Sequence, residues 1–557
     1  MRTIISKPVT MIILALFAIA SIATVMFYGD FLGIDDAHIF FSYAENLASG
    51  HGISYAHNNT PVEGCTSLLW LFICAINFAI GFDEIGVLIT SILVLLATQW
   101  IWLKIIRIVV SEDEDSWLWQ SVYAMLILSS VFYFSWMSAS LMDCAIWGLI
   151  IAWLTLVLLQ DINPKSNCDV KGRTIQISTA LPFILAPWTR PESMLIVPGC
   201  ISLMLACNLI KRNPVRRPLI FATLFLLSTA SITIFRIWYF GYPLPNTFYA
   251  KVSPSLSYNL NIGLHYAIWY LRSGIVVPVF AACFIAKAIS FVYHPTMDRD
   301  SPLWLWCLIL CASPILAGGD HFKCFRFFQP AYPVMCVLIT VILASIVKCG
   351  TVNASMPLPM FRKLLIIILM ALTIPFLWWR SNSWAYVFTQ YSPKFIEEEF
   401  STAKDRFDRG ILLSRIFDDI REKPALGVIA AGGVARTYSG PIVDLMGLND
   451  TTVAHYPGER KGIKNHAAFE PGVFNQLNVD IMVFPPDKRH TNFLKGLCTN
   501  DTFTAIYRYV RISRKDNAQL HVDALARREY LNSLPLDKFR FYDLMKCNEG
   551  VWSSVEQ

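Results

Sequence analysis

Two adjacent aspartates, Asp35 and Asp36, follow the first apolar run of the chain and open a polar stretch that reaches about Ser67. Carboxylates at a membrane face are costly to desolvate and are seldom retained without a partner or a task. Two carboxylates this close also tend to separate into one group of low pKa and one of raised pKa. The pair therefore predicts a catalytic base. The alternative is a helix N-cap ahead of a helix over 37–47.

Later polar segments carry cations suited to a phosphate group. In the loop 318–327, an arginine could form a charge-assisted and bidentate contact with phosphate, or the loop could be a solvated cap. The loop after Gly-Tyr-Pro-Leu-Pro brings several hydrogen-bond donors together, although these prolines could also form only a rigid turn. Two further arginines near the ends of apolar segments could meet a lipid phosphate or snorkel to the interface. The candidates are Arg190 and Glu192, which could also be a simple ion pair, then Asn246, Tyr249, Lys251, Asp320, His321, Lys323 and Arg326, and finally Arg236 and Arg272.

Composition predicts the class of protein that must position these residues. Hydrophobic residues make up 55% of the 557 and charged residues only 15%, and the mean hydropathy is +0.49. Soluble domains carry about a quarter charged residues, so a polytopic membrane protein is predicted. The net charge of +6 does not call for a nucleic-acid partner.

The fourteen cysteines contain no CxxC pair, so neither a zinc site nor a redox motif is indicated. We predict no cofactor. A divalent metal held by Asp36, Asp320 and His321 is conceivable but not indicated. Cys498 and Cys547 could form a disulfide if the C-terminal region is exported.

Apolar runs predict the membrane spans, because a spanning helix needs roughly 20 mostly apolar residues and at least about 17. The N-terminal run is expected to be an uncleaved anchor, since it is long for a signal peptide and lacks a cleavage site. Segments 68–80 and 256–273 are expected to lie at the outer interface. About eleven spans are predicted: 11–29, 86–103, 117–135, 141–160, 174–189, 193–210, 218–240, 274–293, 302–317, 330–347 and 364–380.

Basic residues in short loops orient this array, because cytoplasmic loops are enriched in Lys and Arg. With five basic clusters in the cytoplasm, the N-terminus is cytoplasmic and all the polar candidate loops fall outside. This one-sidedness predicts an active site facing away from the cytoplasm. The clusters are Arg2/Lys7, Lys104/Arg107, Lys165/Lys171/Arg173, Lys211/Arg212/Arg216/Arg217 and Lys348/Arg362/Lys363.

Hydropathy falls from about Ser381, which divides the chain into a membrane domain, 1–380, and an extracytoplasmic domain, 381–557. The first outer loop of the membrane domain spans 30–67. In the second domain, runs at 427–431 and 479–484 predict buried strands, and 394–421 and 516–532 predict helices. The predicted fold is an α-helical polytopic membrane protein with a C-terminal α/β or α+β domain.

These segments resemble, in matching order, the GT-C arabinofuranosyltransferases, cell-wall enzymes that add terminal arabinofuranose from a polyprenyl-phosphate donor. Two positions depart from the pattern: Cys65 replaces an aromatic residue and Asp143 replaces a glutamate. The resemblance is carried by 35–55, by 62–70, by Arg190-Pro-Glu192, by 243–251, by Gly318-Gly-Asp320 with Arg326-Phe327, and by 443–450.

The resemblance implies an inverting transfer in which a carboxylate takes the proton of the acceptor hydroxyl. It assigns this base to the Asp35/Asp36 pair, with Asp35 preferred. It assigns the leaving phosphate to Lys251 and Arg326, with Arg190 and Arg272 in reserve. The predicted substrate-binding residues are Tyr43, Asn46, Glu63, Glu192, Asn246, Tyr249, Asp320, His321, Asp444, Asp450, His455 and His466.

The expected partners are a polyprenyl-phosphate sugar, a cell-envelope glycan or glycoconjugate acceptor, and the lipid bilayer of the inner membrane. One alternative is an outer-leaflet polysaccharide ligase or polymerase acting on diphosphate-linked glycans, which should show a large central outer loop. A transporter is another, but its ionisable residues should lie in mid-span within an inverted repeat. We expect the C-terminal domain to bind the acceptor; a structural lid or a separate hydrolase are its alternatives.

Overall fold

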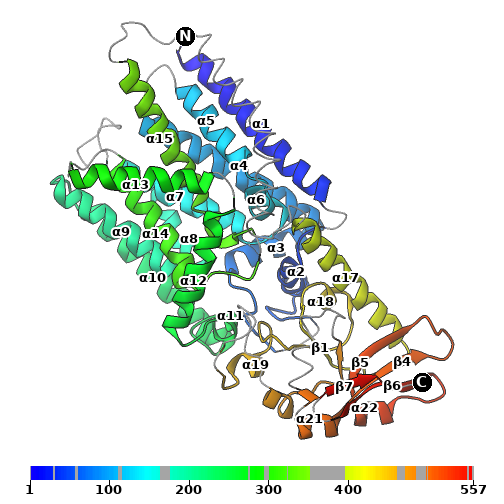
Figure 1. Cartoon of the computed structure of the whole chain (residues 1–557). Helices are drawn as coiled ribbons and strands as arrows, with labels where there is room; N and C mark the ends of the chain where they lie inside the picture. Colours follow the sequence, from blue (N-terminus) through cyan, green and yellow to red (C-terminus); the bar gives the residue numbers. More distant parts are fainter. Residues whose placement is uncertain are drawn as a thin grey trace.

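The computed structural model describes residues 2–28, 32–56, 60–110, 116–162, 176–273, 276–293, 300–322, 324–351, 395–458, 460, 471–483, 497–498, 500–548 and 551–554. Apolar helices gather toward the end that holds the N-terminus, and a β-sheet domain lies at the opposite end with the C-terminus (Figure 1). The functional residues lie between these two parts.

Long apolar helices form the membrane part. Six described helices are long and apolar enough to cross a bilayer, or up to seven if one bent pair counts as a span. The first member of that pair is α5 (Ser116–Leu128). The second is α6 (Val131–Phe134) continued by the π-helix η1 (Ser135–Ala139), and the two members are bent by 77° relative to each other. The six are α1 (Arg2–Tyr28), α4 (Asp83–Val110), α7 (Cys144–Ile162), α9 (Ser193–Ile210), α10 (Arg216–Phe240) and α13 (Val276–Tyr293).

Shorter apolar helices account for most of the remaining predicted spans. The segment predicted to span at 174–189 is a helix of 13 residues, α8 (Ile177–Thr189), interrupted by Pro182 and Pro187. Segment 364–380 lies outside the described residues, so the total of about eleven spans stays a prediction. The other short apolar helical stretches are α3 (Leu68–Ala79), α14 (Ser301–Leu316) and the part Tyr332–Ile346 of α15 (Tyr332–Thr351).

Four short elements stand between the membrane helices and the sheet domain. The helix α2 (Asp35–Ala48) begins at the aspartate pair, with Ile34 rather than an aspartate at its N-cap. It packs against α3, whose N-cap Ser67 accepts a hydrogen bond from Trp70 N. The other elements are α11 (Asn246–Lys251), α12 (Leu256–Leu271) and the 3₁₀ turn η3 (Arg326–Phe328).

The C-terminal domain is a mixed sheet with strand order β2-β1-β3-β5-β4-β6-β7. The first three strands in this order are parallel and the rest antiparallel. Its elements are α17 (Phe395–Ile416), β1 (Leu426–Val428), α18 (Gly433–Thr437), β2 (Ile442–Asp444), α19 (Thr451–His455), η4 (Pro471–Asn475), β3 (Ile481–Val483), α21 (Asp501–Ile506), β4 (Tyr507–Arg514), β5 (His521–Arg527), α22 (Arg528–Ser533), β6 (Phe539–Asn548) and β7 (Val551–Ser554).

The helix predicted over 516–532 is wrong for most of its length. Residues 521–527 form β5, which pairs with β3 on one side and β4 on the other. The alanines and leucine of this segment favour a helix in isolation, but burial between two strands overrides that preference. Cys498 is in a disulfide. The side chain of Cys547 lies outside the described part, so the pairing of these two cysteines stays a prediction.

Candidate functional site

A cavity of about 350 Å³ lies where α2, α11, α14 and η3 meet the C-terminal domain. Its wall combines six acidic or basic side chains with apolar ones, so it can take a ligand that has both a charged and an apolar part. The residues that line it are Asp36, Ile39, Phe40, Gly64, Cys65, Thr66, Met142, Asp143, Arg190, Pro191, Glu192, Leu195, Pro245, Thr247, Phe248, Lys251, Val252, Ser313, Leu316, Ala317, Gly319, Arg326, Phe327 and Leu448.

The two adjacent aspartates face different surroundings. Asp36 lines the cavity and lies 3.9 Å (Oδ2) from Arg326 Nη1. Asp35 does not line the cavity: its carboxylate accepts hydrogen bonds from Gly432 N at 3.2 Å and Gly433 N at 2.9 Å. Which aspartate acts as the base stays a prediction, and the geometry favours Asp36 over the preferred Asp35, because of the two only Asp36 lines the cavity. Successive helical residues point about 100° apart, which lets Asp36 face the cavity while Asp35 faces Gly432 and Gly433.

The docked position of Asp35 explains Gly432, whereas a Cβ on Gly433 would instead meet α17, 2.6 Å from Phe407 N. A Cβ on Gly432 would lie 1.8 Å from Asp35 O, so no side chain fits there. Burial raises the pKa of Asp35 to about 6, even though Gly433 N–H stabilises its charged form. Asp35 thus joins α2 to the C-terminal domain.

One part of the cavity lining is an arginine that forms ion pairs with two carboxylates. The Arg190 guanidinium donates to both oxygens of Asp143, at 2.9 and 3.1 Å, and to Glu192 at 2.8 Å. Burial alone would raise the pKa of Glu192, but Arg190 outweighs it and holds this pKa below its ordinary value. Since Arg190 is fully engaged, it has little capacity left for a phosphate. We call Asp143, Arg190 and Glu192 the paired wall.

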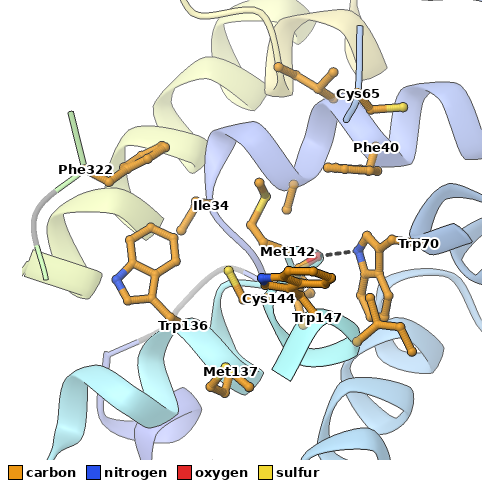
Figure 2. Close-up of a cluster of buried hydrophobic side chains, with 14 of the residues drawn as sticks. Ile34, Phe40, Cys65, Trp70, Trp136, Met137, Met142, Cys144, Trp147 and Phe322 are labelled. Carbon is orange, nitrogen blue, oxygen red and sulfur yellow. Dashed lines mark hydrogen bonds between the residues drawn. The ribbon is translucent and has the colours of Figure 1, made fainter. Parts of the chain in front are cut away.

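A strained turn brings Asp143 to this wall. Leu141 has a left-handed φ of 58°, and its carbonyl accepts a 3.1 Å hydrogen bond from Trp70 Nε1. Figure 2 shows this bond among buried aromatic side chains under the site. Non-glycine residues keep such a backbone only where the surroundings enforce it, and they cluster at functional sites.

Arg326 is held in place by contacts with Asp320 and Phe322. Its Nε lies 2.7 Å from Asp320 Oδ2, and its guanidinium lies 4.8 Å from the ring centre of Phe322. Burial raises the pKa of Asp320, but Arg326 and His321 reverse this and keep it well below the ordinary value. Asp320 and His321 do not line the cavity: Asp320 pairs with Arg326, and His321 lies against Asp320, so their substrate contact stays a prediction.

The lining residues contributed by α11 differ, because their polar groups have no partner among the described residues. Lys251 lines the cavity and forms no hydrogen bond or ion pair with any described residue. Burial lowers its pKa, and nearby Asp36 partly opposes this. Thr247, one helical turn earlier, also lines the cavity, and its buried hydroxyl has no partner among the described residues. We call Thr247, Phe248 and Lys251 the α11 wall.

Three further residues, predicted to bind substrate or the donor phosphate, do not line the cavity, and two of them instead stabilise the surrounding structure. Glu63 forms a buried ion pair with Arg236 at 2.8 Å. Asn46 donates to Ser54 O and Ala56 O within the first outer loop. Arg272 is exposed at the C-terminal end of α12, away from the cavity lining. None of the three lines the cavity.

The predicted residues of the C-terminal domain also serve the framework. The carboxylate of Asp444 accepts from Met446 N, and that of Asp450 caps α19 through Val453 N. His455 stacks between two tyrosine rings, 4.2 Å from Tyr242 and 4.3 Å from Tyr249. His466 and Lys323 lie outside the described residues. The domain reaches the cavity through the side chain of Leu448.

Sequence reasoning missed some of the cavity lining. Asp143 and Cys65 were noted only as departures from a family pattern, and Thr247 and Leu448 were not assigned a role. The spacing of Thr247 and Lys251 on one short helix was the available signal, because residues four apart share a helix face. The described part of the chain holds no cluster of three or more His, Cys, Asp or Glu side chains arranged for a metal.

No protein-family model and no curated protein sequence matches the chain. Solved structures do. ArnT from Cupriavidus metallidurans bound to undecaprenyl phosphate has a TM-score of 0.52 at 10% identity, covering 93% of this chain and 98% of that one. The apo form of the same protein gives 0.52 at 11% identity, with the same coverage. The apo oligosaccharyltransferase from Archaeoglobus fulgidus gives 0.51 at 10% identity, covering 95% of this chain and 75% of that one.

At such low identity the likeness concerns the fold. It confirms the predicted class: the chain is a multi-pass helical membrane protein of the GT-C type with a C-terminal sheet domain.

Proposed function

We propose that the protein is an inverting membrane glycosyltransferase. It moves a sugar from a polyprenyl-phosphate donor to a glycan or glycoconjugate acceptor on the extracytoplasmic face. The observation that carries the proposal is one cavity that combines a carboxylate, Asp36, with two cations, Lys251 and Arg326. The fold likeness to a protein bound to undecaprenyl phosphate supports a lipid phosphate as the ligand.

The chemistry assigns one task to each group. The acceptor hydroxyl gives its proton to Asp36 while its oxygen attacks the anomeric carbon. The bond from that carbon to the phosphate oxygen breaks, and the configuration inverts. Polyprenyl phosphate leaves with the bonding electrons, and Lys251 and Arg326 stabilise its negative charge.

Exposed apolar side chains at the cavity supply a path for the lipid tail. Leu195, Phe248, Val252 and Leu316 line the cavity and are each 36–42% exposed. They come from α9, from α11 and the residue after it, and from α14, so the opening lies beside membrane helices. A polyprenyl chain can extend out of the cavity through this opening while its phosphate group stays beside Lys251.

The charges favour a monophosphate over a diphosphate donor. Arg190 is engaged by two carboxylates, which leaves Lys251 and the outer nitrogens of Arg326 for the ligand. Two cations match the single charge of a phosphodiester better than the two charges of a diphosphate. The alternative, a ligase or polymerase using diphosphate-linked glycans, is therefore less well supported. We propose an arabinofuranose-like sugar on the family resemblance alone.

The test is release of polyprenyl phosphate from candidate donors by purified protein in detergent, with monophosphate- and diphosphate-linked sugars compared. We expect turnover of a monophosphate donor and a loss of about 10²–10⁴-fold in Asp36→Asn. Asp35→Asn, the neighbouring control, should retain turnover if it folds. Consumption of diphosphate donors only would support the ligase, and full activity of Asp36→Asn would move the base elsewhere.

A further inference from the structure

One loop of the C-terminal domain connects the two elements that carry the proposed base and the proposed phosphate cation. The loop runs from Asp444 to Asp450 and lies between α2 and α11. Asp36 lies on α2, whereas Lys251 lies on α11. These two helices are separated by about two hundred residues of chain, so their relative position depends on tertiary contacts.

On the α11 side, the contact is made by one side chain. The Asn246 amide Nδ2 donates to three backbone carbonyls of the loop, those of Gly447 at 2.8 Å, Leu448 at 3.0 Å and Asp450 at 3.3 Å. Asn246 N also donates to Glu63 O at 3.1 Å. Asn246 is buried, so these bonds are shielded from water.

On the α2 side, a chain of hydrogen bonds reaches the same loop. Tyr43 OH donates to Asn449 Oδ1 at 3.1 Å and accepts from Gly64 N at 3.1 Å. The Asn449 amide nitrogen donates in turn to Asp444 Oδ2 at 2.9 Å. Tyr43 lies two turns along α2 from Asp36, on a fully buried part of that helix.

The packing at this junction leaves no free space. A Cβ on Gly64 would lie 1.8 Å from Asn449 Oδ1 and 2.6 Å from Tyr43 OH. The loop itself is fixed internally, because both oxygens of Asp444 accept from its backbone, at Met446 N and Asn449 N. The loop also presents Leu448 to the cavity. It is therefore a rigid connection with one side chain in the ligand space.

We infer that the loop 444–450 is a brace that sets the distance between Asp36 and Lys251, with Asn246 and Tyr43 as positioning residues. This inference rests on the proposed function. It gives the C-terminal domain a part in aligning the reacting groups, beyond binding the acceptor. Misplacement of a reacting group by about 1 Å can cost as much as 10²-fold in rate, so such a brace matters for turnover.

The test compares Tyr43→Phe and Asn246→Ala with a matched control, Tyr55→Phe. Tyr55 is equally buried and its ring packs against that of Tyr43, but its hydroxyl donates to Ala431 O of the same domain and not to the loop 444–450. All three variants should lose similar thermal stability. We expect kcat to fall at least about tenfold in the two brace variants only, with donor KM changed much less. The double variant Tyr43→Phe/Asn246→Ala should fall little further, because both changes break one connection.

Hydrogen exchange gives a readout that does not need turnover. In Tyr43→Phe, backbone amides of α11 should exchange faster although Tyr43 does not contact α11, and in Tyr55→Phe they should not. Unchanged α11 exchange and kcat in folded Tyr43→Phe and Asn246→Ala would overturn the brace, as would an equal loss of kcat in Tyr55→Phe. If the wild-type protein turns over no polyprenyl-phosphate sugar, the proposed function fails, and the exchange data alone decide about the brace.

Discussion

The paired wall and the α11 wall line one cavity but differ in how their charged and polar groups are satisfied. On the paired wall, Arg190 pairs with two carboxylates, and side-chain exposure is 7% for Arg190 and 1% for Asp143. On the α11 wall, the half-buried Lys251 and the buried Thr247 hydroxyl have no hydrogen-bonding partner among the described residues. Buried polar groups are nearly always satisfied, so the difference separates a framework from groups that await a ligand.

The largest expected effect comes from breaking the paired wall. Arg190→Ala leaves Asp143 and Glu192 buried without their cation, and loss of one partner of a buried pair typically costs 3–5 kcal/mol. We expect a large loss of thermal stability, measured by heating in detergent. The control is Arg511→Ala in the sheet, whose pair with Asp523 is 35% exposed on both sides and should cost at most about 1 kcal/mol. Equal losses in the two variants would contradict a structural role for this wall.

Some features of this site could be predicted from the sequence and others could not, for physical reasons. Apolar run length is a local signal, and it located helices at all the predicted spans that fall within described residues. The partner of Arg190 is Asp143, 47 positions away, and no local pattern contains that contact. Asp35 and Asp36 are chemically identical in sequence, and only the rotation of α2 gives one to the cavity and the other to Gly433. Segment 521–527 has the composition of a helix, and only pairing with two strands makes it β5.

Asp35 can be compared with the carboxylates of the paired wall, because it is a buried carboxylate that accepts hydrogen bonds from backbone amides and not from a cation. Its pKa is raised to about 6, whereas that of Glu192, beside Arg190, is lowered. Between about pH 4 and 6 the folded protein keeps a proton on Asp35 that the unfolded chain has released. The contribution of Asp35 to the free energy of unfolding is therefore fully present below about pH 4. It decreases by about 2–3 kcal/mol as the pH rises to about 6 and beyond.

The variant Asp35→Asn removes this titration. We expect its thermal stability, relative to wild type, to improve from pH 5 to pH 7 when both are measured in the same detergent. Parallel stability profiles for the two proteins would show that Asp35 does not titrate in this range.

Lys251 tests the α11 wall from the ligand side. Lys251→Met keeps the length of the side chain but removes the charge, and a hydrogen bond to a charged group contributes about 1.5–3 kcal/mol. We expect donor KM, or the dissociation constant of undecaprenyl phosphate, to rise by about tenfold or more. Thermal stability should hold or increase, because burial disfavours the charged amine. Lys287→Met, which loses a lysine paired with Asp300 outside the cavity, is the control and should leave donor affinity unchanged.

Arg326 tests the fork geometry on the same phosphate. Arg326→Lys keeps the charge but loses the planar donor set that reaches Asp320 and the ligand together. We expect weaker donor binding and a loss of stability together, unlike Lys251→Met, because Arg326 both pairs with Asp320 and lines the cavity. A variant that lost only donor affinity or only stability would mean that Arg326 serves one of these two contacts and not both.

The smallest expected effect concerns Thr247, whose buried hydroxyl has no partner among the described residues. Thr247→Val replaces that hydroxyl with a methyl group of similar shape. An unsatisfied buried hydroxyl costs about 1–3 kcal/mol, so its removal should raise thermal stability in the free protein. Thr98→Val in α4 is the control, because its hydroxyl donates to Val94 O and its loss should lower stability slightly. If Thr247→Val also weakens donor binding while Thr247→Ser preserves it, the hydroxyl turns toward the ligand once the cavity is filled. Lower stability in Thr247→Val would mean that the hydroxyl is satisfied, and the contrast between the two walls would then rest on Lys251 alone.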